Sequence, residues 1–207
     1  MSDLLVERVL EPDQEAALAH LTGIGLGRAI AVLGDVLGVR LRPREPVVHF
    51  VSLPDEDLHQ REEFDDPWSA VSADFRGDST GRVAAALPRT TIDYLCSRLG
   101  GLDAWRDASR AVPAVTGQEI AGIFLNSLVD GFRPLLSPEL RFSPPQPSTD
   151  LAAWWRDAGT EAVGGVRTEL TVEDGDHDLQ VQFALVAGPR ALDDLLLAVQ
   201  GMTGGIR

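Results

Sequence analysis

The stretch His20–Ile30, HLTGIGLGRAI, carries Gly23, Gly25 and Gly27 and at first resembles a loop that holds a phosphate. A dinucleotide-binding loop needs a strand before its glycines and a helix after them. Here the residues before Gly23, DQEAALAHLT, are strong helix formers, and Arg28 stands where the third glycine of that pattern would be. A glycine inside a helix costs about 1 kcal/mol relative to alanine. We therefore predict a helix whose glycines allow close packing against another backbone.

The elements predicted around this stretch form two halves with the same order. In the first half, a long helix over 13–37 precedes an extended run at 47–51, a hairpin that turns at 77–81 and a closing helix over 89–101. In the second half, a small-residue helix over 115–132 precedes a proline-bounded extended piece over 137–147, a hairpin that turns at 174–176 and a closing helix over 189–201.

Both closing helices begin with Pro-Arg directly after a strand, at Pro88 and at Pro189. A duplicated unit of about 100 residues explains this repetition, with halves of about 13–100 and 113–200. We predict one pseudo-symmetric α+β domain over residues 1–207. Gly117, Ala121 and Gly122 in the second long helix favour packing of the two long helices against each other or across a sheet.

Composition limits the classes of partner and site. The net charge is −14, and all 18 basic residues are arginine, so nucleic acid is not an expected partner. Cys96 is the single cysteine, which excludes an internal disulfide and favours a buried small side chain over a reactive thiol. The chain begins without a signal-peptide pattern and has no uninterrupted apolar run of about 18 residues. We predict a cytoplasmic protein with no membrane partner.

No metal or cofactor is predicted. The four histidines, His20, His49, His59 and His177, lack metal-ligand spacing. The segment EDGDHD lacks the final glutamate of a calcium loop and is read as a hairpin turn. Ser79 in GDSTG is assigned to a turn, because a serine nucleophile needs a strand-to-helix elbow with a matched histidine and acid.

The segments HLTGIGLGRAIAVLGDVLG and VTGQEIAGIFLNSLVDGF are similar to the first and second long helices of the CheC, CheX and FliY chemotaxis phosphatases. The segment ADFRGDSTGRVAAALPRTTIDYLCSRLGG resembles the hairpin and helix that follow the first of these helices. The resemblance covers roughly 13–199. It implies a pseudo-twofold, duplicated CheC-like domain with a central, largely antiparallel sheet and two long helices on one face.

In that family each active helix carries Glu-x-x-Asn, with a proline some two dozen residues later. The resemblance implies that the Asn orients a water on the phospho-aspartate of a response regulator, while the Glu grips the regulator's lysine. Residues three apart on a helix have Cβ atoms about 5–6 Å apart, so both side chains can reach one phosphoryl group. Positioning of the water is most of this task, since aspartyl phosphate is already labile.

The first helix departs from this motif. Alignment of the glycines puts His20 at the Glu position and Gly23 at the Asn position, with Pro46 at the proline position. Glycine has no side chain that could orient a water.

The second helix can be aligned in two registers. A match of the small residues puts Val115 and Gln118 at the Glu and Asn positions, whereas a match of Pro145 puts Glu119 and Gly122 there. We prefer the first, which matches more positions. Glu119 and Asn126 share a face but are separated by about 10.5 Å along the axis, too far for joint action on one phosphoryl group.

The leading hypothesis is a CheC-like signalling protein that has lost or weakened the phosphatase motif and binds a CheY-like response regulator or a CheD-like protein. An active aspartyl-phosphate phosphatase that uses Gln118 and Glu119 in one half-site is the first alternative. A scaffold role like that of the catalytically silent middle domain of FliM is the second.

Overall fold

The computed structural model describes residues 12–52, 69–78, 80–100, 111–133, 139–148, 154, 164–175 and 177–203. The first half contains α1 (Pro12–Leu37), β1 (Arg42–Pro43), β2 (Val47–Ser52), β3 (Ser69–Arg76), β4 (Gly81–Leu87) and α2 (Arg89–Gly100). The second half contains α4 (Ala111–Phe132), β5 (Arg141–Phe142), β6 (Gln146–Ser148), β7 (Gly164–Asp174), β8 (His177–Ala187) and α6 (Pro189–Thr203).

The strands form one eight-stranded sheet in the order β1-β7-β8-β4-β3-β5, with β2 also paired to β7 and β6 to β3. All these pairings are antiparallel. From either edge inward, the sheet has a short first strand of one half and then the two hairpin strands of the other half, so that β8 and β4 lie at the centre. The first strands of each half pair with the hairpin of the other half, so the two halves are interleaved.

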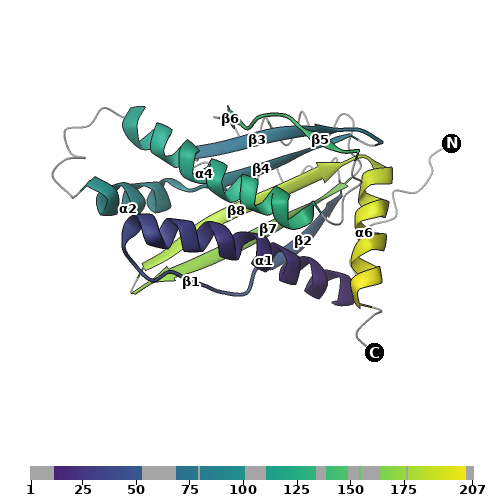
Figure 1. Cartoon of the computed structure of the whole chain (residues 1–207), viewed down its shortest axis with the longest axis horizontal. Helices are drawn as coiled ribbons and strands as arrows, with labels where there is room; N and C mark the ends of the chain where they lie inside the picture. The colour runs from purple at the N-terminus through teal and green to yellow at the C-terminus, as the bar shows by residue number, and fades with distance from the viewer. Residues whose placement is uncertain are drawn as a thin grey trace.

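The helices α1 and α4 lie across one face of this sheet, α2 lies near one end, and α6 stands near the other (Figure 1). Alternate residues of the central strands are buried in the same core as these helices, for example Val83 and Ala85 of β4 and Phe183 and Leu185 of β8. The predicted α+β class, antiparallel sheet and pair of long helices on one face are therefore confirmed.

Only one of the three glycines in His20–Ile30 packs closely against another helix. A Cβ on Gly25 would lie 3.0 Å from the carbonyl oxygen of Ser127 and 3.5 Å from Cα of Gly131. A Cβ on Gly27 would meet nothing within 4 Å. The expectation of close packing is therefore correct for Gly25, and wrong for Gly27, whose side faces open space.

The small residues of α4 pack against different parts of the structure. Gly131 is its contact with α1, because a Cβ there would lie 2.9 Å from Cα of Gly25. Gly117 instead allows approach to the sheet, where a Cβ would lie 2.7 Å from Oγ of Ser69. A Cβ on Gly122 would meet nothing within 4 Å.

The two closing helices begin at different residues of their shared Pro-Arg sequence. Pro88 precedes α2, whereas Pro189 is the first residue of α6. The first backbone bonds run from Ile92 N to Pro88 O and from Leu192 N to Gly188 O, at 3.1 and 3.2 Å. The structural equivalent of Pro88 is therefore Gly188, and the Pro-Arg match locates the repeat only to within one residue.

The helix α1 is apolar for a helix at a protein surface. An 18-residue window within it has a mean hydropathy of 1.5, enough by length and composition for a membrane span. Half of that window is buried against the rest of the structure, and such burial is typical of core helices in soluble proteins. His20, Arg28 and Asp35 interrupt the apolar residues of this helix, so the expectation of no uninterrupted apolar run holds, and cytoplasmic localisation stays a prediction.

Candidate functional site

The first motif position lies on α1, beside the connection to β2. His20 is exposed and Gly23 is partly buried. A Cβ on Gly23 would lie 4.0 Å from Cγ of Pro46, so this proline sits next to the Asn position, as the alignment implies. The site has no carboxylate at His20 and no amide at Gly23.

The second motif position lies on the outer side of α4. Val115, Glu119 and Asn126 are exposed, whereas Gln118 and Gly122 are partly buried. Their buried neighbours, among them Ile120 and Ala121, face the core. Glu119 and Asn126 thus share the solvent side, two turns apart. Gln118 lies at the margin of this face, a poorer position for an amide that must reach a partner.

The two registers of the second helix have a structural cause. The long helices end at Leu37 and Phe132, 95 positions apart, whereas the following strands begin at Arg42 and Arg141, 99 positions apart. The connection from helix to strand is thus four residues longer in the second half. A shift of 95 makes Val115 and Gln118 the counterparts of His20 and Gly23, and a shift of 99 makes Glu119 and Gly122 the counterparts. Four residues are about one helical turn, so both registers present the same face outward.

The outer surface of the long helices exposes large apolar side chains. Of the seven such residues recorded in the part of the chain that the structure describes, four lie on α1 and α4: Ile24, Val32, Val36 and Val115. Ile24 is 51% exposed and Val36 is 61% exposed. We call these four residues the helix-face residues. Ile24 follows the motif residue Gly23 and Val115 is itself a motif residue, whereas Val32 and Val36 lie further along α1.

A polar cluster that sequence reasoning missed joins α2 to the β7–β8 hairpin. The Tyr94 hydroxyl donates to Oδ2 of Asp174 at 2.5 Å, and Arg98 donates to the same oxygen at 3.0 Å. The His177 ring stacks on Tyr94 with centroids 4.6 Å apart. The hydrogen bond from Tyr94 lowers the pKa of Asp174 against the opposing effect of burial.

Asp174 and His177 of this cluster belong to the segment EDGDHD, which the sequence predicts to be a hairpin turn. Asp174 pairs with His177 across the hairpin end, and Gly175 has a φ of +60°. This confirms the hairpin. The spacing of 80 residues between Tyr94 and Asp174 left no local signal in the sequence. Among the described residues, no group of three or more His, Cys, Asp or Glu could hold a metal ion. Ser79 and His59 lie outside the described residues.

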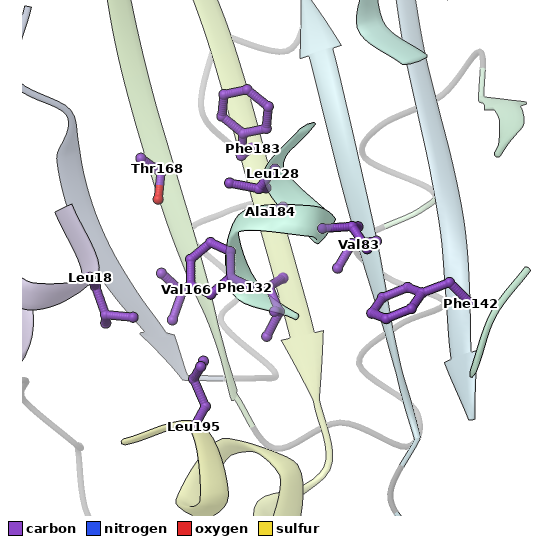
Figure 2. A pocket seen from close by; sticks show the side chains of 12 residues that line it. Leu18, Val83, Leu128, Phe132, Phe142, Val166, Thr168, Phe183, Ala184 and Leu195 are labelled. Atoms are coloured by element: carbon purple, nitrogen blue, oxygen red, sulfur yellow. The ribbon is translucent and has the colours of Figure 1, made fainter. Parts of the chain in front are cut away.

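A small cavity lies between the sheet, α1, α4 and α6 (Figure 2). Its walls are apolar, including Leu18, Phe132 and Leu195, with Thr168 as the polar exception. The space open to the centre of a water molecule is about 20 Å³. This is room for about one water. The cavity is a packing defect of the core and not a substrate pocket.

The single thiol is also part of the core. Cys96 is 2% exposed, and burial raises its pKa. The sequence-based prediction of a buried small side chain is confirmed.

No family model matches the chain, and no curated protein matches it. Solved structures do. FliY from Thermotoga maritima superposes with a TM-score of 0.67 at 14% identity, covering 94% of this chain and 99% of FliY. The FliM middle domain from H. pylori superposes with a TM-score of 0.64 at 9% identity, covering 91% of this chain and 99% of that domain. A chain of the FliG–FliM complex from H. pylori superposes with a TM-score of 0.62 at 9% identity, covering 90% of this chain and 99% of that one. The chain therefore has the CheC-like α+β fold that FliY and the FliM middle domain share.

Proposed function

We propose that this protein is a docking member of a chemotaxis or two-component pathway, which binds a CheY-like response regulator through the outer faces of α1 and α4. It forms one domain from two halves of about 13–100 and 113–200. In this proposal the regulator keeps its phosphoryl group, because neither long helix presents a carboxylate and an amide three residues apart at the motif positions.

One observation carries the proposal. The positions where the resemblance implies a catalytic pair hold His20 and Gly23 on α1, and no pair in either register on α4. The surrounding surface is nevertheless exposed and apolar at the helix-face residues. Exposed large apolar side chains occur at protein contact surfaces. Loss of chemistry with retention of a contact surface supports binding without turnover.

Binding is tested with the response regulators encoded in the same genome, each with and without beryllium fluoride as an aspartyl-phosphate mimic. Ile24→Glu should weaken capture of the bound regulator by at least about tenfold, which corresponds to about 1.4 kcal/mol. Leu197→Glu is the matched control, because Leu197 is 64% exposed but lies on α6. Equal effects of both substitutions, or no binding to any regulator, would contradict the proposal.

The phosphatase alternative rests on Gln118 and the exposed Glu119. It predicts that the protein speeds loss of the phosphoryl group from a regulator and that Gln118→Ala abolishes this acceleration. A wild-type rate no faster than spontaneous hydrolysis would remove this alternative.

A gain-of-function variant tests the motif directly. Gly122→Asn completes Glu-x-x-Asn with Glu119, and the space beside Gly122 is open within 4 Å. If α4 follows the register of Pro145, this variant should hydrolyse the phosphoryl group that the wild-type protein leaves intact. Gly27→Asn, at a similarly open position outside the motif, is the control.

The scaffold alternative is supported by the shared fold with FliM, which one of the solved structures shows in complex with FliG. It predicts capture of a flagellar or CheD-like protein in place of a response regulator. A pull-down that compares these three classes of purified partner distinguishes it from the leading proposal.

A further inference from the structure

Two arginines face each other across the sheet edge where β3 meets β5. Arg76 pairs with Arg141 in the antiparallel register, next to Phe75 with Phe142. Side chains of directly opposed residues lie on the same side of a sheet, with Cβ atoms about 4.5–5.5 Å apart. Both arginines are exposed. Like charges placed in this way are destabilising unless a counter-charge lies between them.

Neither of these arginines has a carboxylate partner among the residues that the structure describes. Within the described residues, six arginines form ion pairs with Asp or Glu: Arg44, Arg82, Arg89, Arg98, Arg133 and Arg167. Arg76 and Arg141 are not among them. Arg76 and Arg141 line an open recess together with two acidic residues, Asp74 and Glu139. Arg82 holds the Asp74 carboxylate at 3.1 Å. In a chain with a net charge of −14, these two guanidiniums lie opposite each other on adjacent strands without an ion pair in the described part of the chain.

The other edge of the pseudo-symmetric sheet provides the comparison. There Arg42, at the start of β1, lies opposite Glu173 of β7. Arg42 and Arg141 hold equivalent places, as the first residues of the short strands. In register, the first edge sets an arginine opposite a glutamate, whose carboxylate Arg44 holds at 2.7 Å, whereas the second sets two arginines opposite each other. Among the described residues, no carboxylate stands opposite Arg141 at the second edge as Glu173 stands opposite Arg42 at the first.

The register that creates the arginine pair is fixed by packing. The rings of Phe75 and Phe142 lie 5.6 Å apart. A Cβ on Gly77 would lie only 2.8 Å from the carbonyl oxygen of Glu139, so glycine is needed for this approach. The Ser143 hydroxyl accepts a hydrogen bond from the backbone N–H of Asp74 at 3.0 Å. These contacts hold the two arginines opposite each other.

The pair lines an open recess of about 600 Å³, together with Asp74, Gly77, Glu139, Phe142 and Ser143. Figure 1 shows β5 beside the end of β3, at the edge of the sheet. We propose that this recess binds a phosphate dianion, free or as a monoester, between the guanidiniums of Arg76 and Arg141. Guanidinium groups donate two parallel hydrogen bonds to phosphate oxygens, and the charge of about −2 neutralises both arginines. This site is independent of the proposed docking function.

The test measures binding of inorganic phosphate by calorimetric titration and by the thermal midpoint, at constant ionic strength with chloride as the background anion. The wild-type protein should bind phosphate saturably. Arg76→Gln and Arg141→Gln should each weaken binding by at least about tenfold. Arg190→Gln is the control, since Arg190 is exposed on α6 and should leave phosphate affinity unchanged. An added monoester, glycerol 3-phosphate, distinguishes the two sources: tighter binding than phosphate indicates an ester, and weaker binding indicates free phosphate.

A second variant separates anion binding from a purely structural effect. Arg76→Glu recreates at this edge the Arg–Glu pairing of the other edge, so it should raise the thermal midpoint without phosphate and abolish the further rise with phosphate. The proposal is overturned if wild-type protein shows no saturable phosphate binding, if Arg76→Glu binds phosphate as well as wild type, or if acetate binds as tightly as phosphate.

Discussion

The contact between Gly25 and Gly131 sets the distance between the two long helices, and substitution of Gly25 by alanine should reveal its cost. Two effects compete in Gly25→Ala. Alanine in place of glycine inside a helix stabilises it by about 1 kcal/mol. The new Cβ lies 3.0 Å from the Ser127 carbonyl oxygen and 3.4 Å from Cα of Leu128. Both are backbone atoms that cannot rotate away, and overpacking of this kind costs about 1–3 kcal/mol.

The matched control is two residues away in the same helix. Gly27→Ala has the same gain in helix propensity, and its Cβ would meet nothing within 4 Å. We expect Gly27→Ala to stabilise the protein by up to about 1 kcal/mol, and Gly25→Ala to fall about 1–3 kcal/mol below it. In a protein of this size 1 kcal/mol shifts the thermal midpoint by about 2–4 °C. The two variants should therefore be clearly distinguishable.

Urea unfolding followed by circular dichroism measures both effects as shifts in midpoint at constant slope. Gly131→Ala tests the other side of the contact. Its effect should not add to that of Gly25→Ala, because residues in direct contact are coupled. A Gly25→Ala protein as stable as Gly27→Ala would refute the close approach of α1 and α4.

Two further outcomes follow from the buried polar groups. Tyr94→Phe should cost about 1–3 kcal/mol at neutral pH, because it removes a donor from the Asp174 carboxylate, whose side chain is 9% exposed. The folded-state pKa of Asp174 is below its ordinary value of 3.8, so this stabilisation is present above about pH 4 and lost as pH falls through the folded pKa. Urea midpoints of wild type and Tyr94→Phe should therefore converge in acid, and a constant gap down to pH 2 would contradict this assignment. The Cys96 thiol, buried and with a raised pKa, should react with a disulfide reagent only as the protein unfolds, and rapid reaction in native buffer would contradict its burial.

The sequence predicted the elements well where local spacing determines them. The apolar repeat of α1 indicates a helix because buried residues such as Leu18, Leu26 and Leu33 recur on one face. The second hairpin was predicted from EDGDHD, and Gly175 adopts the positive φ that such a turn requires. Duplication then indicated a repeated fold, because two identical orders of elements are unlikely to arise independently.

Contacts between distant segments could not be predicted in the same way. The small residues predicted packing of the long helices against each other or across a sheet; Gly25 meets Gly131 of α4, whereas Gly117 meets Ser69 of the sheet. A helical face shows only that small residues are buried, and the crossing point depends on how both helices lie on the sheet. The exchange of edge strands between halves was likewise hidden, since β1 pairs with β7 more than 120 residues later. Pairings over such distances leave no periodic signal.

The interleaving also explains how the candidate site could change without loss of the fold. Because β5 and β6 pair with β3 of the first half, their places are fixed by that hairpin and not by the helix α4 that precedes them. The four extra residues between α4 and β5 are therefore absorbed in the connection. Since four residues make about one turn, the outer face of α4 keeps its orientation while its residues move along the axis relative to Pro145. A shift of this kind moves a carboxylate and an amide together relative to Pro145, so it changes which residues of α4 lie beside the proline while the outer face stays available to a partner, as the docking proposal requires.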